Sequence, residues 1–76
     1  MEERILNVLA EINEEIVDYD GDNLFDAGIL DSFQVMDLVN DLEDEFDIEI
    51  DAKYVVEENF LTKEAIVELV LMIMNE

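Results

Sequence analysis

The chain has 76 residues, of which 3 are Lys or Arg and 23 are Asp or Glu, giving a formal net charge of −20, yet 51% of its residues are hydrophobic. This apolar content excludes a disordered acidic tail and predicts one small folded domain over residues 1–76. Binding to nucleic acid or to an anionic membrane surface needs clustered Lys and Arg, which pair with phosphate groups. This chain lacks such clusters, so both are excluded as partners.

The residue types that are missing exclude most catalytic chemistry. The chain contains no Cys and no His, which excludes a disulfide framework, a Cys nucleophile, a Ser-His-Asp relay and a His-ligated metal. Paired carboxylates could still act as a general acid and base, but in so acidic a chain such pairs occur by chance and indicate no active site. We therefore expect no enzyme activity. The first residues lack a signal-peptide pattern and no apolar run reaches the roughly 18 residues of a membrane span, so we expect a cytoplasmic protein that does not insert into membranes.

A helical repeat opens the chain. The apolar residues Ile5, Leu9, Ile12 and Ile16 are spaced by four, three and four positions, which is the period of an amphipathic helix. The spacing predicts a first helix over residues 2–17.

Residues 18–31 are predicted to form a long loop. They contain both glycines of the chain, Gly21 and Gly28, together with several Asp and Asn residues, all of which favour turns. The loop is not a loose linker, because four apolar residues within it are expected to pack against the helices: Leu24, Phe25, Ile29 and Leu30.

The start of this loop resembles a calcium-binding pattern without completing it. Asp18, Asp20 and Asp22 alternate as carboxylates do in an EF-hand loop. That template needs Gly and Glu where this chain has Asn23 and Ile29, so the sharp turn and the bidentate ligand are both lost. We predict no specific metal site here.

A second helix is predicted to begin after Asp31. Asp31 as the N-cap, with Gln34 three residues later, forms a variant of the capping box. Four positions are expected to mark the inner face of this helix: Met36, Val39, Leu42 or Glu43, and Phe46.

The last third of the chain predicts a connector and a buried helix. Residues 47–51 alternate polar and apolar like a strand but have no second strand to pair with, so we interpret them as a connector. A short helical turn is expected near residues 56–59. Thr62 is then the predicted cap of a final helix, with Glu64 in its first turn. The predicted fold is all-α, a small four-helix bundle of three main helices and one short helix, with a long loop between helices 1 and 2.

Ser32 is the only serine of the chain and lies at the predicted start of the second helix. A hydroxyl there lies beside unpaired backbone N–H groups and the positive end of the helix dipole, an environment that stabilises a phosphate ester. Serine is also common at helix starts as a simple cap. The local pattern leaves both interpretations open.

A longer pattern surrounds Ser32. Residues 28–33 read Gly-Ile-Leu-Asp-Ser-Phe, followed by Val-Met-Asp-Leu-Val, Leu-Glu-Asp-Glu-Phe and Ile-Glu-Ile over residues 35–50, and the pattern continues through residues 57–66. It resembles the acyl carrier protein and peptidyl carrier protein family over essentially the whole chain. The resemblance implies that a phosphopantetheinyl transferase attaches 4'-phosphopantetheine from coenzyme A to Ser32, and that Asp31 caps the helix and presents Ser32.

The resemblance also implies a function and its partners. The thiol of the prosthetic group would carry an acyl or aminoacyl cargo as a thioester, loaded by a ligase and used by a downstream synthase or transferase. Carriers of fatty-acid synthesis usually have Asp and Met at the positions of Gln34 and Asn40. This chain is more similar to stand-alone carriers of the D-alanyl, aminoacyl or specialised acyl type, and the cargo stays open.

Helical spacing predicts a docking surface opposite the inner face of the second helix. Basic patches on partner enzymes would be attracted to its acids, with Phe33 as an apolar anchor, unless Phe33 packs against Leu24 or Phe25. Glu43 matches an acidic docking position of the family, although its helical phase places it at the edge of the core. We expect a monomer. The predicted docking residues are Phe33, Asp37, Asn40, Asp41, Glu43 and Asp44.

A second function from another class is considered beside the carrier. The chain would then be an acidic interaction module or a divalent-cation-binding module that never receives a prosthetic group. Its acidity supports weak, nonspecific cation binding in either case.

The charge itself generates a prediction about stability. Repulsion among so many carboxylates destabilises the compact state and is screened by salt or divalent cations. Added sodium or magnesium chloride should raise the melting temperature, and a gain of about 1 kcal/mol corresponds to roughly 4–8 °C for a domain of this size. A melting temperature that is indifferent to both salts would contradict this account of the charge.

Overall fold

The computed structural model describes residues 1–75, and within them the chain is all-helical. The described elements are α1 (Glu2–Ile12), α2 (Glu14–Asp18), α3 (Ser32–Phe46), η1 (Ala52–Tyr54), η2 (Glu57–Phe60) and α4 (Lys63–Met74), where η denotes a 3-10 helix. The all-α class and the small helical bundle are therefore confirmed, as is the long loop that precedes α3.

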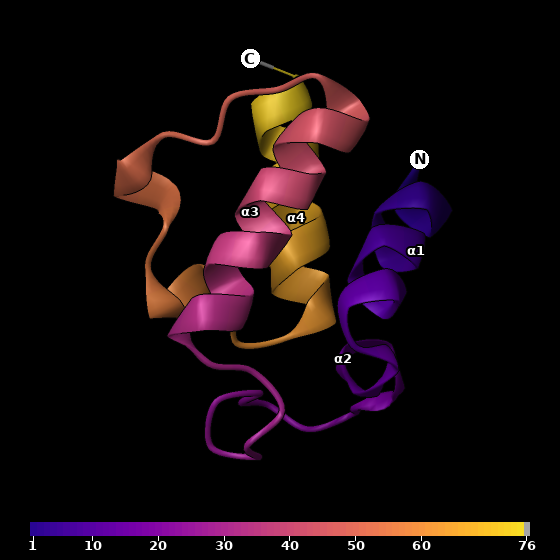
Figure 1. Cartoon of the computed structure of the whole chain (residues 1–76), viewed down its shortest axis with the longest axis vertical. Helices are drawn as coiled ribbons and strands as arrows, with labels where there is room; N and C mark the ends of the chain where they lie inside the picture. Colours follow the sequence, from indigo (N-terminus) through magenta and orange to yellow (C-terminus); the bar gives the residue numbers. More distant parts are fainter. Residues whose placement is uncertain (76) are drawn as a thin grey trace.

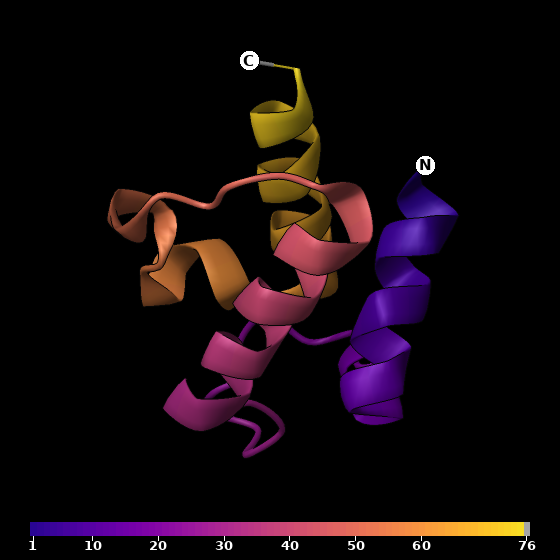
Figure 2. The same ribbon diagram turned by 45° about the horizontal axis from the view of Figure 1, so that its top comes forward.

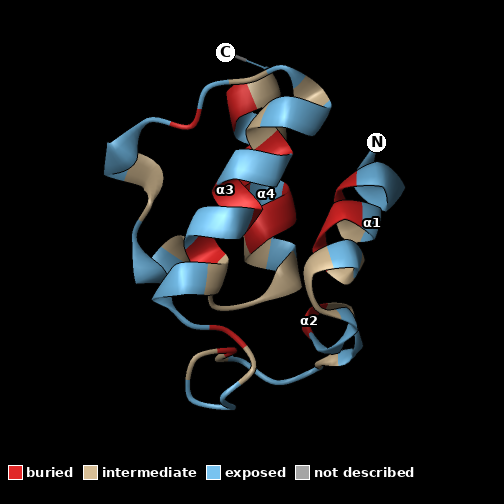
Figure 3. Ribbon diagram, in the orientation of Figure 1, coloured by how far each residue is buried: buried red, intermediate tan, exposed pale blue. Residues whose placement is uncertain are grey.

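The helices enclose one apolar interior. α1 contacts both α3 and α4, and η2 packs on α4; Figures 1 and 2 show α1 beside α3, with the loop before α3 at the opposite end from the C-terminus. The buried faces of α1, α3 and α4 turn inward in Figure 3. Every buried residue in the described range is hydrophobic. The Asp and Glu side chains of residues 1–75 therefore lie outside the core.

The first helix is shorter than predicted, because it breaks at Asn13. The backbone of Asn13 is extended (φ −163°, ψ 111°), and its side-chain oxygen accepts a hydrogen bond from the Glu15 N–H at 3.0 Å. An Asn side chain that binds nearby backbone in this way competes with continuation of a helix. Ile16 is still buried after the break. The helical spacing of apolar residues therefore continues past Asn13, and the spacing alone could not reveal the break.

The predicted inner face of α3 is partly wrong. Val39 and Leu42 are buried as expected, but Val35 and Leu38 complete the inner face, whereas Met36 is 55% exposed. Apolar residues occur in adjacent pairs along this helix, so they fit two different helical faces. The buried face is the one that contains Val35 and Leu38.

Phe46 is also less buried than expected, and its surroundings account for this. It packs only partly against the core at the end of α3. The Arg4 guanidinium lies 5.0 Å from the centre of its ring and also pairs with Glu45 at 3.0 Å. The ring therefore contributes to the joint between α1 and α3 and not to the centre of the core.

The connector after α3 contains no strand, as predicted, and the expected short helical turn is present as η2. Asp47 ends α3 in a left-handed conformation (φ 52°). The Glu43 carboxylate then accepts a hydrogen bond from the N–H of Ile50 at 2.8 Å, and Ile50 is buried. η1, which was not predicted, starts with the Asp51 carboxylate accepting from the Lys53 N–H at 3.0 Å.

The last helix agrees with its prediction. The Thr62 hydroxyl accepts a hydrogen bond from the Ala65 N–H at 3.1 Å and begins α4. Most apolar positions of α4 are buried: Ile66, Val67, Leu69, Val70 and Ile73. Among residues 1–75, no helix has the length and apolar character needed to cross a bilayer.

Backbone hydrogen bonds hold the loop between α2 and α3 in place. The N–H of Leu24 donates to the carbonyl of Leu61 at 2.8 Å, and the carbonyl of Leu24 accepts from both Ile29 and Leu30 at 3.0 and 3.2 Å. Leu24 and Leu30 are buried, while Phe25 and Ile29 pack against the core with part of their surface exposed. The loop residues therefore pack as predicted.

Lys63 ties the beginning of α4 to the end of α2. Its Nζ donates to the backbone carbonyl of Val17 at 2.6 Å and lies 3.7 Å from the exposed carboxylate of Asp20. A cation at the C-terminal end of a helix also interacts favourably with the helix dipole.

Removing this amine should destabilise the fold. Lys63→Met keeps the apolar stem but deletes the charged donor, and we expect a loss of about 1–2 kcal/mol in the free energy of unfolding by denaturant titration. Lys53→Met is the matched control, because it changes the net charge equally at an exposed position. Equal losses for the two variants would contradict a specific role for Lys63.

Candidate functional site

Ser32 is the first residue of α3 and is exposed. The cap of this helix is Asp31, whose carboxylate accepts from the Gln34 N–H at 2.9 Å, while its carbonyl accepts from the Val35 N–H at 3.0 Å. Asp31 therefore occupies the N-cap position that the sequence predicted. Because the capping bond to Gln34 is made by Asp31, the Ser32 hydroxyl is not needed for that purpose.

The second half of the predicted capping box is not formed. Instead of reaching back to Asp31, the side-chain oxygen of Gln34 is buried and has no hydrogen-bond partner within residues 1–75. Asp31 alone makes the side-chain cap.

The N-terminus of α3 favours a negative charge at Ser32. α3 is 15 residues long, and its first turn contains no acidic residue. The N–H groups of the first turn have no carbonyl partner inside a helix, and the helix dipole is positive at this end. The Asp31 carboxylate already occupies the Gln34 N–H, so the dipole and the remaining first-turn N–H groups favour an anionic ester on the Ser32 hydroxyl.

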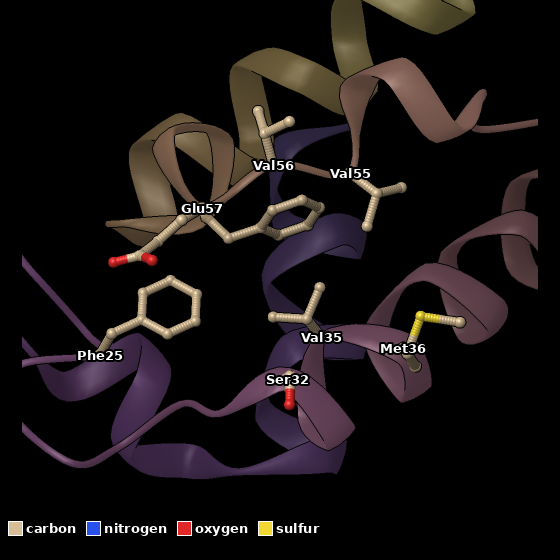
Figure 4. Close-up of a pocket in the computed structure, with 8 residues that line it drawn as sticks. Phe25, Ser32, Val35, Met36, Val55, Val56 and Glu57 are labelled. Atoms are coloured by element: carbon tan, nitrogen blue, oxygen red, sulfur yellow. The ribbon is translucent and has the colours of Figure 1, made fainter.

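An apolar pocket of about 270 Å³ opens beside Ser32 (Figure 4). Figure 4 shows the Ser32 oxygen directed away from the apolar side chains, whereas Val35 extends toward Val55 and Val56. Ser32 thus lies at the rim of the pocket. The lining comes from the loop, the first turn of α3 and the segment around η2: Phe25, Ser32, Val35, Met36, Val55, Val56, Glu57 and Phe60.

Sequence reasoning did not single out the wall contributed by residues 55–60. Val55 and Val56 form an apolar pair in a mostly polar segment, and Val56 is 43% exposed. This apolar pair, which fits no helical repeat, was the one feature of the sequence that could have indicated the wall of the pocket. Its position opposite Ser32 depends on the tertiary path of the connector and could not be read from spacing.

The outward stripe of α3 lies on the surface as the helical period predicts. Phe33 is 83% exposed, so the alternative in which it packs against Leu24 or Phe25 is wrong. Met36 joins the stripe, and Figure 3 shows this face of α3 as exposed. The other exposed members are Asp37, Asn40, Asp41 and Asp44.

Glu43 lies apart from this exposed stripe. It is half-buried, and its carboxylate holds the N–H of Ile50. The structure therefore gives Glu43 a position in the packing of the connector, as its place at the edge of the core suggested.

The acidic start of the loop is not assembled into a metal site. Across residues 1–75, no group of three or more Asp or Glu side chains is arranged to hold a metal ion. Asp20, the middle carboxylate of the EF-hand-like segment, lies near Lys63 instead.

Comparison with known proteins identifies a matching family and a similar relative. Residues 3–70 match the family described as the phosphopantetheine attachment site. The chain is also 32% identical over 76 residues to a D-alanyl carrier protein from Streptococcus suis, in an alignment covering 99% of this chain and 96% of that protein. No solved structure matches the chain significantly.

Proposed function

Because the chain belongs to the phosphopantetheine attachment-site family, a family of carriers and not of enzymes, we propose that Ser32 is its attachment residue. 4'-Phosphopantetheine is the covalent prosthetic group of this family. The observation that carries the assignment to Ser32 is its exposed hydroxyl at the start of α3, beside the apolar pocket and left free by the Asp31 cap.

The residues around Ser32 suit the group. The Ser32 oxygen would form the phosphodiester with loss of its proton, as the nucleotide half of coenzyme A leaves. N–H groups in the first turn of α3 favour the ester's negative charge, and Phe25, Val35 and Val56 provide apolar surface next to it. When bound, the group supplies the thiol on which an acyl or aminoacyl cargo is carried as a thioester.

D-Alanine is the first cargo to test. The similarity to a D-alanyl carrier protein supports an aminoacyl cargo, and this chain has Gln34 and Asn40 where carriers of fatty-acid synthesis usually have Asp and Met. The proposed protein is a monomeric carrier with a single domain over residues 1–76. Its partners are a phosphopantetheinyl transferase, a loading ligase and a downstream synthase or transferase.

The exposed stripe of α3 is the proposed docking surface for these partners. Phe33 offers an apolar side chain directly next to Ser32, while Asp37, Asp41 and Asp44 attract a basic patch. Exposed charge of this kind mainly raises the rate of association, and a central aromatic residue mainly slows dissociation.

Attachment at Ser32 can be tested by intact mass. Incubation of the chain with coenzyme A and a phosphopantetheinyl transferase of broad specificity should increase its mass by about 340 Da, the mass of the attached group. Ser32→Ala should show no increase, and Ser32→Thr, which keeps a hydroxyl, tests whether the position tolerates a β-branched acceptor.

The alternative, an acidic module without a prosthetic group, predicts no mass increase on the natural chain. That result would contradict the assignment of Ser32 as the attachment residue. A mass increase on Ser32→Ala would show that the group is attached to another residue.

Docking can be tested by the rate of cargo loading. We expect Asp37→Lys combined with Asp41→Lys to slow loading of D-alanine by a D-alanyl carrier ligase about fivefold or more at low salt, because the attraction that steers the partner is reversed. Loading should also become less dependent on salt.

The matched control makes the same charge change elsewhere. Asp18 at the end of α2 and Asp22 in the loop that follows are both exposed and lie outside the stripe of α3, and their replacement by Lys alters the net charge equally. If the two double variants load at the same rate, the stripe has no specific role in docking.

A further inference from the structure

A second groove lies between α1 and α4, and its floor is apolar. Leu6 from α1 and Val67 and Leu71 from α4 contribute to the lining of this space of about 340 Å³. Leu6 and Leu71 pack against the core yet keep part of their surface exposed. The two helices contact one another along this side of the bundle.

The rim of the groove is acidic. Glu2, Glu64 and Glu68 line it, and all three are exposed. Within residues 1–75 the ion pairs join Arg4 to Glu45 and Lys63 to Asp20, so none of the three rim acids is neutralised by a pair.

The single cation in the lining does not offset this charge. Lys63 belongs to the groove, but its amine is engaged by the carbonyl of Val17 at 2.6 Å and lies near Asp20. The groove therefore presents an apolar floor bordered by three carboxylates that lack a partner of opposite charge.

We propose that this groove binds a basic amphipathic helix of a partner protein. Figure 1 shows α1 running away from the end of the bundle where the C-terminus lies and α4 running toward it, so the groove follows two antiparallel helices. The lining from Lys63 to Leu71 extends for roughly 12 Å at 1.5 Å per residue, about two helical turns. Apolar side chains at helical spacing would contact the floor, and flanking Lys or Arg would meet the rim acids.

A second copy of the chain is a poor occupant of the groove. Each copy has a net charge of −20 and the same three acids at the rim, so like charges would face one another without compensation. Charge complementarity favours a cationic segment instead.

The groove and the pocket beside Ser32 share no lining residue. The groove is formed by α1 and α4, whereas the pocket is formed by the loop, the start of α3 and the segment around η2. A partner bound in the groove therefore leaves Ser32 and Phe33 available, so that one protein can hold the carrier while another acts on its cargo. This inference goes beyond the proposed function and does not depend on Ser32.

The binding site can be mapped by amide chemical shifts. The probe is a short helix-forming amphipathic peptide of lysine and leucine, titrated into the ¹⁵N-labelled full chain. The largest saturating shifts are expected around Leu6, Val67 and Leu71. Glu64→Lys combined with Glu68→Lys should weaken binding about tenfold, the sum expected for two favourable charge contacts.

Charge-matched and site-matched variants make the result specific. Asp37→Lys combined with Asp41→Lys changes the net charge equally, and it should weaken binding in the groove much less. Ser32→Ala should bind the peptide as the natural chain does, so failure of the attachment proposal and failure of this one are distinguishable. Shifts spread over all faces or centred on α3, equal weakening by both double variants, or dimer formation through the groove would each overturn the proposal.

Discussion

The position of the site depends on one set of backbone hydrogen bonds around Leu24. Its N–H binds the carbonyl of Leu61, just before α4, and its carbonyl receives the N–H groups of Ile29 and Leu30, just before α3. The fully buried Leu24 side chain fastens the same point to the core. The middle of the loop is thus tied to the residue before Thr62, and its last residues are tied to Leu24. The place where α3 starts, and with it the place of Ser32, follows from this constraint.

The high negative charge is compatible with this fold because the charged groups and the core are kept separate. The described core is entirely hydrophobic, and two of the few cations are used where elements meet. Arg4 joins α1 to the end of α3, and Lys63 joins α4 to the end of α2. The remaining acids are left on the surface, where one group lines the outer face of α3 and another borders the groove between α1 and α4. The same excess of charge that weakens the compact state therefore lies on the two surfaces that we propose for basic partners.

Much of the fold could be predicted from local physics, and the errors have specific physical causes. Asp31 and Thr62 were recognisable as caps because a side-chain acceptor at that position satisfies a free N–H regardless of tertiary contacts. The break at Asn13 was missed because the same side-chain chemistry occurred inside an unbroken apolar repeat. The phase of α3 was misread at Met36, since adjacent apolar residues fit two helical faces and only packing decides between them. The place of Ser32 at the start of α3 followed from sequence, whereas the wall formed by Val55 and Val56 needed the three-dimensional path of the connector.

In the function proposed above, this geometry presents the Ser32 hydroxyl as the point of attachment. The most direct measurement is the mass of the protein isolated from the cells that produce it, with fragmentation to locate any modification. We expect a phosphopantetheine group on Ser32, with or without an aminoacyl or acyl cargo, whose mass would identify that cargo. A protein that is entirely unmodified in those cells, or modified only at another residue, would contradict this expectation.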